Sequence, residues 1–287
     1  MKIVEILKEG AKEVKDFLHS QIEKSTYSVR NLKEIEVDLH RRTDNIIIEV
    51  LKKNSIPCVV LNDTSTMYGP ICEEIRIGDD RPEYIVMVDS IDGSINFVKG
   101  FRNYSLALSV AGYDKNVKYK NIEYTLVLNL VTGDVIESYR NHGTYLNGRR
   151  VNSPRDSTLE GAIVSIDLNF RGQNPEIFVK RMSEIILRLI DRHARIRMIG
   201  TNSLEASMVS YGAVDLFMDL RDLFQAPDIA PSYLIVKEAG GSVVNGFGHD
   251  FSEIELLSSA KHSVIYAANE RILKEILDVM NIEPTTS

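Results

Sequence analysis

The chain contains no tryptophan and only two cysteines, Cys58 and Cys72. The two cysteines stand in unlike contexts and lack the paired spacing of a zinc site, so we expect neither a disulfide framework nor a zinc knuckle. A chain without a disulfide framework suits a reducing compartment. The expected location is therefore the cytoplasm.

Basic residues are also few: 34 Lys and Arg stand against 41 Asp and Glu, which gives a formal net charge of -7 and a pI near 5.5. Surfaces that follow nucleic-acid phosphates carry an excess of Lys and Arg, which is absent here. No apolar run approaches the roughly 18 residues that cross a bilayer. Neither nucleic acid nor a membrane is an expected partner.

The sequence does contain a large apolar fraction, 44 % of 287 residues, which is enough for a two-part fold or two docked subdomains. Apolar residues at helical spacing over 3–22 predict an amphipathic helix, and Thr43 is expected to cap a second helix that ends near Lys53. Runs of β-branched residues follow, with turn residues at 132–134 and 147–148, and they predict strands and hairpins. Residues 1–155 are therefore expected to form an α+β subdomain.

A polar stretch near residue 155 separates this region from residues 156–287, in which strand and helix patterns alternate. Such alternation indicates an α/β subdomain with helices that cover a sheet. Asn269 is expected to cap the last helix, and Gly240 to follow the end of the helix before it.

The stretch VMVDSIDGSINF at 86–97 places Asp89 and Asp92 where a buried strand ends. Residues at the carboxyl ends of strands in α/β sheets border a crevice, and Gly93 and Ser94 allow a tight turn into a helix start that suits a phosphate. Two neighbouring carboxylates need protons or a cation, and Mg²⁺ prefers hard oxygen ligands. An Asp-rich turn with a helix cap remains the structural alternative.

Two further aspartates extend this metal hypothesis. Asp228 lies in APDIAPSYLIVKEAGG, where it could instead simply cap a helix whose first turn contains Pro231. Asp63 ends the apolar run VVLND and would face the same crevice if its strand neighbours the strand that ends at Asp89. A turn residue at position 63 would give the same pattern.

Several segments, in order along nearly the whole chain, match the boxes of one family. DSIDGS at 89–94 is similar to a DPIDGT box, and PDIAPSYLIVKEAGG at 227–241 to a WDxAA box followed by EAGG. The remaining matches are DLHRRTD at 38–44 to DLVTxTD, NDTS at 62–65 to GEES, the NG hairpin at 147–148, and RxxGT at 197–201.

The chain thus resembles the inositol monophosphatase and fructose-1,6-bisphosphatase superfamily of magnesium-dependent, lithium-sensitive phosphatases. The short DLFMDLRDLF segment at 215–224 most resembles archaeal members, many of which accept both inositol phosphates and fructose bisphosphate. The resemblance implies a layered αβαβα sandwich, with the main metal site in residues 1–155 and further ligands from residues 156–287. It also implies a homodimer or homotetramer.

The resemblance further implies a ligand set for two or three Mg²⁺ ions. Asp89 would bridge two of them. Asp63 and the Ile91 carbonyl would complete the first position, and Asp92 and Asp228 the second.

Catalytic and substrate-binding roles also follow from the resemblance. Ser94 would hold the attacking water and would itself be oriented by Asp44, while the Gly93 and Ser94 amides would bind the phosphate. Asp92 would also meet the substrate, and Asp219 would contact sugar hydroxyls. The other implied substrate contacts are Arg197, Gly200 and Thr201.

Five positions depart from the family pattern, one of which is Pro227 in the place of a tryptophan. Asp63 and Thr64 replace two glutamates, which shortens a metal ligand and lowers the negative charge of the site. Ser90 replaces a proline, and Ser94 replaces a threonine but keeps its hydroxyl.

The expected function is hydrolysis of small sugar or cyclitol phosphates by a metal-activated water. The alternatives are a phosphatase for 3'-phosphoadenosine nucleotides, which is usually built on a longer chain, and a non-catalytic phosphate-sensing protein on the same fold. Such chemistry does not require histidine, so His40 is expected to have no catalytic role. The HRR segment at 40–42 could be surface charge or a phosphate clamp.

Overall fold

The computed structural model describes residues 2–22, 32–63, 72–78, 81–169 and 174–282. The helices are α1 (Lys2–Ile22), α2 (Leu32–Lys53), α3 (Ser94–Lys99), α4 (Pro175–Asp191), α5 (Asn202–Ser207), α6 (Ala226–Glu238) and α7 (Glu270–Val279). The strands are β1 (Cys58–Asp63), β2 (Cys72–Ile77), β3 (Tyr84–Asp92), β4 (Ser105–Gly112), β5 (Ile122–Asn129), β6 (Val135–Tyr139), β7 (Gly143–Leu146), β8 (Arg149–Val151), β9 (Ile163–Asp167), β10 (Arg195–Arg197), β11 (Leu216–Phe224), β12 (Ser242–Asn245) and β13 (His262–Ala267).

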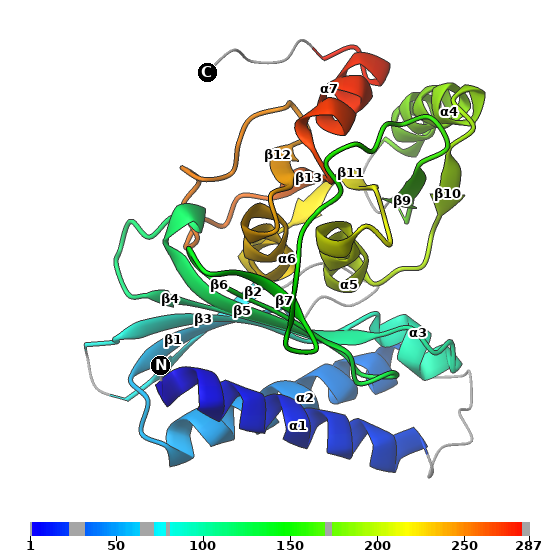
Figure 1. Ribbon diagram of the computed structural model, residues 1–287. Coiled ribbons are helices and arrows are strands. Elements are labelled where there is room, and N and C mark those ends of the chain that lie inside the picture. Colours follow the sequence, from blue (N-terminus) through cyan, green and yellow to red (C-terminus); the bar gives the residue numbers. More distant parts are fainter. Residues whose placement is uncertain (1, 23–31, 64–71, 79–80, 170–173, 283–287) are drawn as a thin grey trace.

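The elements form five layers (Figure 1). Helices α1 and α2 cover one face of an eight-stranded sheet, and α5 and α6 separate that sheet from a five-stranded sheet, which α4 and α7 cover on the outside. Helix α6 contacts strands of both sheets. The predicted αβαβα sandwich is therefore confirmed.

The larger sheet has the order β2-β1-β3-β4-β5-β6-β7-β8, and β1 and β3 are its parallel pair. The smaller sheet has the order β10-β9-β11-β13-β12, with β9 parallel to both β10 and β11. Consequently β1 and β3 end at one edge of the first sheet, and β9 and the parallel part of β11 end at one edge of the second.

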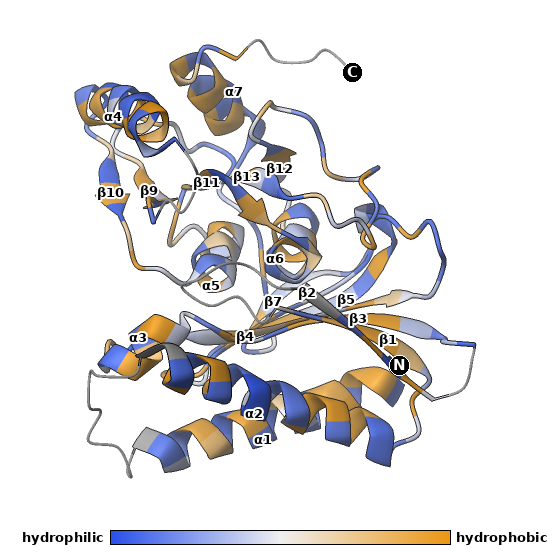
Figure 2. Cartoon of the chain, turned by 180° about the vertical axis from the view of Figure 1, so that it is seen from behind, coloured by the Kyte–Doolittle hydropathy of each residue, from blue (hydrophilic) through white to orange (hydrophobic). Residues whose placement is uncertain are grey.

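Alternate residues of β3 enter two different hydrophobic cores. Val86 and Val88 pack toward α1 and α2, whereas Ile85 and Met87 pack toward the layer that contains α6. A strand that is buried on both faces reads as a continuous apolar run, as residues 85–88 do. Figure 2 shows this hydrophobic centre, with mixed hydrophobic and hydrophilic residues on the covering helices α1, α2 and α4.

Most local predictions hold. The order of strands and helices after residue 155 is confirmed, Asn269 accepts a hydrogen bond from the Ile272 amide at 2.9 Å as the cap of α7, and the NG hairpin turns at Asn147 and Gly148 with positive φ. The division into subdomains at residue 155 stays a prediction. No helix in the described part of the chain is long and apolar enough to cross a membrane.

The predicted start of the second helix is wrong. Helix α2 begins at Leu32, so Thr43 lies inside the helix and does not cap it. The Thr43 hydroxyl donates to the carbonyls of Leu39 and His40, both at 3.0 Å, which is how a buried threonine is accommodated within a helix. Because α2 begins earlier than predicted, Glu36 and His40 belong to this helix.

Pro231 also lies deeper than predicted. It stands inside α6 and not in its first turn, where Pro227 is found instead. The backbone hydrogen bond that a proline cannot donate is therefore lost within the helix.

Candidate active site

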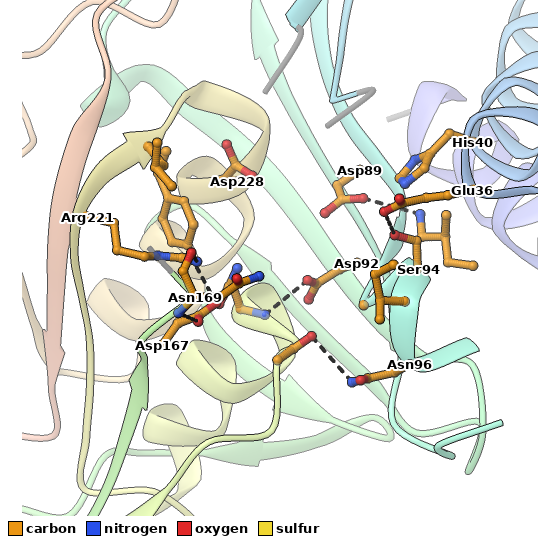
Figure 3. Close-up of a pocket in the computed structure, with 17 residues that line it drawn as sticks. Glu36, His40, Asp89, Asp92, Ser94, Asn96, Asp167, Asn169, Arg221 and Asp228 are labelled. Atoms are coloured by element: carbon orange, nitrogen blue, oxygen red, sulfur yellow. Dashed lines mark hydrogen bonds and ion pairs between the residues drawn. The ribbon is translucent and has the colours of Figure 1, made fainter. Parts of the chain in front are cut away.

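A pocket of about 250 Å³ lies where the carboxyl ends of β3 and β9 and the start of α6 meet. Figure 3 shows its two walls: one carries Asp89, Asp92 and Ser94 together with α2, and the other carries Asp167 and Arg221 of the second sheet. Asp228 of α6 lies between them. The pocket is thus built from both sheets.

Asp89 and Asp92 are placed by an irregularity at the end of β3, where the register with β4 shifts between these two residues. Both side chains are buried to about nine-tenths or more and line the pocket. The Ile91 amide donates to Asp89 Oδ1 at 3.2 Å, which turns this carboxylate back over its own strand. The two aspartates therefore reach the pocket although neither lies in an open loop.

The Asp92 carboxylate accepts hydrogen bonds from four donors in two elements. Ser105 Oγ of β4 donates at 3.0 Å, and the backbone amides of Asn202, Ser203 and Leu204 at the start of α5 donate at 3.0, 2.9 and 3.4 Å. Burial nevertheless raises the pKa of Asp92 to about 7, and the neighbouring Glu205 carboxylate acts in the same direction. A cation in the pocket would relieve this charge.

Gly93 connects β3 to α3 in a conformation that favours glycine, with φ of 82°. A Cβ at this position would lie 2.5 Å from Thr201 Cγ2 and 3.1 Å from the Asn103 carbonyl oxygen, so a larger residue would displace its neighbours. Ser94 is the first residue of α3 and lines the pocket. The predicted helix start at Ser94 is confirmed.

The partner of Ser94 differs from the prediction. Ser94 Oγ donates to Glu36 Oε1 at 2.8 Å, and not to Asp44. Asp44 instead accepts from Ser90 Oγ at 2.5 Å and from Asn62 Nδ2 at 3.1 Å. Asp44 is buried and does not line the pocket, so its predicted contact with Ser94 is a wrong one.

His40 lies on the same face of α2 as Glu36, one turn further along, and also lines the pocket. Its side chain is buried, and neither ring nitrogen has a hydrogen-bond partner among the described residues. Burial lowers the pKa of His40 to about 4, which keeps the imidazole neutral. His40 is thus a buried, neutral residue and does not contribute to the surface charge. The exposed Arg41 and Arg42 both pair with Asp38.

Asp228 is the third residue of α6 and not its cap, which is Gln225. Its Oδ2 accepts from the Gln225 amide at 2.8 Å, in a reciprocal arrangement that fixes the first turn of the helix. Asp228 also lines the pocket. The capping contact and the position in the pocket therefore coexist.

Asp219 does not lie where the prediction put it. It is fully buried and absent from the pocket lining, and it binds the Arg221 guanidinium, whose Nε lies 3.0 and 2.8 Å from its two carboxylate oxygens. Arg221 also pairs with Asp167 at 2.9 Å and itself lines the pocket. Arg221 is therefore the charged residue of β11 that lines the pocket, together with the apolar Leu223 and Phe224.

The remaining predicted substrate contacts separate into two groups. Gly200 lines the pocket. Thr201 is fully buried beneath it and accepts from Asn103 Nδ2 at 2.5 Å, and Arg197 is exposed and outside the lining. The backbone of Asp63 ends β1 beside β3, one residue beyond the pair Asn62–Val88, but its side chain lies outside the described residues.

The donor chemistry of the pocket suits Mg²⁺. Asp89, Asp92 and Asp228 supply carboxylate oxygens, and Ile91 also lines the site. Among the residues that the structure describes, no three His, Cys, Asp or Glu side chains converge as a ready-made metal site. The chain thus brings suitable ligands to one pocket, and their metal-binding roles stay predictions.

Comparisons with known proteins show the family of this chain. The family model described as "Inositol monophosphatase family" matches residues 2–281. The chain belongs to the inositol monophosphatase family. A fructose-1,6-bisphosphatase/inositol-1-monophosphatase of Thermococcus kodakarensis is 28 % identical over 86 % of this chain and 85 % of that protein.

Another relative and one solved structure are also similar to this chain. A bifunctional NADP phosphatase/NAD kinase of Methanococcus maripaludis is 31 % identical over 75 % of this chain, a match that covers 40 % of that longer protein. The solved structure of a Thermotoga maritima IMPase superposes with a TM-score of 0.73 at 22 % identity and covers 98 % of this chain and 97 % of that one. The structural match shows the shared fold.

The charged and polar pocket residues that the sequence analysis did not predict include Glu36, Asp167, Asn169 and Arg221. The spacing of Glu36, His40 and Asp44 by four residues would have placed them on one helix face if α2 had been extended backward. Asp167 is a charge at the end of the apolar strand β9, the same signal that indicates Asp89, whereas Arg221 lies within β11.

Proposed function

We propose that this member of the inositol monophosphatase family is a Mg²⁺-dependent phosphomonoesterase that hydrolyses small sugar or cyclitol phosphates, such as inositol-1-phosphate and fructose-1,6-bisphosphate. The observation that carries the proposal is that Asp89, Asp92 and Asp228, from distant parts of the chain, line one pocket together with Ser94. The names of the archaeal relatives support the substrate class.

The proposed Mg²⁺ ligands are Asp89, Asp92 and Asp228, with Asp63 and the Ile91 carbonyl as further oxygen donors. When bound, Mg²⁺ supplies positive charge that neutralises phosphate oxygens and makes a water easier to deprotonate. Without such charge, three carboxylates in one pocket would repel a phosphate ester. The number of ions, two or three, and inhibition by lithium are parts of this proposal.

Among the residues of this chain, Ser94 is the one that we propose orients the water that attacks the phosphate. Its only hydroxyl hydrogen is directed to Glu36, so its lone pairs are left to accept a hydrogen bond from a water in the pocket. The Gly93 and Ser94 amides are the proposed donors to phosphate oxygens. A water oriented by Ser94 and a phosphate held beside it require no covalent phospho-enzyme.

The opposite wall is proposed to bind the sugar. Arg221 is fixed by Asp219 and Asp167, and its Nη1 donates to the Asn169 carbonyl at 3.0 Å. A guanidinium that is held on several sides loses little side-chain entropy when a ligand binds, and it can donate to hydroxyl or second-phosphate oxygens. The Asn169 side chain is the neighbouring candidate for sugar hydroxyls.

The test is phosphate release with Mg²⁺ from four substrates: inositol-1-phosphate, fructose-1,6-bisphosphate, 3'-phosphoadenosine 5'-phosphate and NADP⁺. We expect the highest kcat/KM for one of the first two. Preference for either nucleotide would instead favour the alternative nucleotide phosphatase. Binding of phosphate esters without turnover of any would favour a phosphate-sensing protein.

Oligomeric state and location belong to the proposal as well. A homodimer or homotetramer in the cytoplasm is the arrangement implied by the family resemblance. Light scattering of the purified protein measures the first directly.

A further inference from the structure

We propose that Glu36, and not Asp44, is the residue that positions the Ser94 hydroxyl, which makes the N-terminal half of α2 part of the active site. This inference rests on the proposed function, because it assigns the support of the residue that holds the attacking water. It also predicts which pairs of substitutions change the stability of the metal-free protein non-additively, and unfolding measurements test this without an activity assay.

The first observation is the contact itself. Ser94 Oγ donates to Glu36 Oε1 at 2.8 Å, and the exposed fractions of the two residues are 8 % and 2 %. A serine hydroxyl has one hydrogen to donate, and a carboxylate acceptor makes the stronger, charge-assisted kind of bond. Glu36 therefore sets the direction in which the lone pairs of Ser94 point. Figure 3 shows Glu36 reaching from α2 to Ser94 beside Asp89.

The second observation is that Asp44 is committed elsewhere. Ser90 Oγ donates to Asp44 Oδ1 and Asn62 Nδ2 donates to Asp44 Oδ2, while Thr43 Oγ1 lies 2.7 Å from Ser90 Oγ. All four residues are buried, so this network ties α2 to β1 and β3 behind the pocket. Asp44 therefore has a structural task in this network.

The third observation is the chemistry around Glu36. His40, one turn along α2, lines the same pocket with both ring nitrogens unpartnered among the described residues, and its ring is neutral. The Glu36 carboxylate thus lies one helical turn from a neutral ring and accepts the Ser94 hydroxyl. Glu36 is in this sense a positioning residue, because it acts through the Ser94 oxygen.

The experiment is a pair of double-mutant cycles, Glu36→Leu with Ser94→Ala and Asp44→Asn with Ser94→Ala. Leucine resembles glutamate in size and cannot accept a hydrogen bond. We expect Glu36→Leu to lower kcat on the order of 10²-fold with a small change in KM, and to lower it little further in the Ser94→Ala background. Losses from Asp44→Asn should multiply with those of Ser94→Ala.

Two variants separate positioning from folding. Glu36→Gln keeps an acceptor oxygen and should recover most of the kcat that Glu36→Leu loses. Glu49→Leu, on the exposed side of the same helix, is the matched control and should leave kcat unchanged. Equal losses in Glu36→Gln and Glu36→Leu would overturn the positioning role.

The same cycles are measured in the metal-free protein by urea unfolding, which does not depend on activity. We expect the midpoint shifts of Glu36→Leu and Ser94→Ala to be non-additive, and those of Asp44→Asn and Ser94→Ala to be additive. The reverse pattern would overturn the inference. If the parent protein hydrolyses no phosphate ester, the proposed function fails, and the unfolding cycles still decide which carboxylate holds Ser94.

Discussion

The Arg221 guanidinium donates hydrogen bonds to both carboxylate oxygens of Asp219 beneath the wall of the pocket, with Nε 3.0 Å from Oδ1 and 2.8 Å from Oδ2. Asp219 is fully buried, and Arg221 reaches the pocket above it. Asp219, which the sequence analysis assigned to the substrate, thus binds the arginine that lines the pocket.

Replacing Asp219 by asparagine should destabilise the protein, because a buried guanidinium loses a charged partner. Breaking a buried ion pair costs about 3–5 kcal/mol, and Asp167 remains to offset part of it, so we expect a loss of roughly 3 kcal/mol. Urea unfolding measures this loss. Asp167→Asn is the comparison, with a smaller expected loss because Asp167 makes fewer contacts to Arg221. Equal stability of Asp219→Asn and the parent would show that the pair is not structural.

Asp63 offers a test of the shortened ligand. If its carboxylate binds Mg²⁺ directly, Asp63→Glu should lower the Mg²⁺ concentration that gives half-maximal rate, because the longer side chain reaches further. Asp63→Ala should raise that concentration sharply. Titration of activity with Mg²⁺ measures both, and curves that overlay the parent would identify Asp63 as a turn residue.

His40 predicts a specific pH dependence of stability. Its pKa is lowered by burial from 6.5 to about 4, so the unfolded chain takes up a proton between these values while the folded protein does not. The free energy of unfolding should therefore be fully retained above pH 6.5 and fall below it by roughly 1 kcal/mol per pH unit relative to His40→Phe. Urea unfolding from pH 7.5 to 4.5 measures the difference.

His142→Phe serves as the control for an exposed histidine. Parallel stability curves for the parent and His40→Phe would contradict the burial of a neutral imidazole beside the pocket.

Much of the fold is predictable from local patterns in the sequence. The apolar run at 85–88 gave a central strand because β3 is buried on both faces, and Asn269 gave a helix start because its side chain caps the adjacent amide. Asp89 and Asp92 reached the pocket for the same reason, since their position depends on the end of one strand. Such features depend on neighbours in sequence.

The features that were missed depend on contacts between distant segments. Ser94 and Glu36 lie 58 residues apart, and their pairing follows from how α2 packs on β3. The start of α2 was misplaced because Thr43 suits a cap in isolation, while Ser90 and the Leu39 carbonyl satisfy its hydroxyl inside the helix. Asp219 was assigned to sugar hydroxyls by the family resemblance, which does not reveal that Arg221 of this chain pairs with it.

The most direct measurement of the central claim is phosphate release from inositol-1-phosphate and fructose-1,6-bisphosphate by the parent, Asp89→Asn and the control Asp191→Asn, each with Mg²⁺ and with excess chelator. Asp191 lies exposed at the end of α4, away from the pocket lining. We predict that chelator abolishes turnover, that Asp89→Asn lowers kcat/KM at least about 100-fold because several kcal/mol of charge stabilisation is lost, and that Asp191→Asn matches the parent. Turnover that persists in chelator, or in Asp89→Asn at the parent's rate, would contradict a metal-dependent phosphatase site in this pocket.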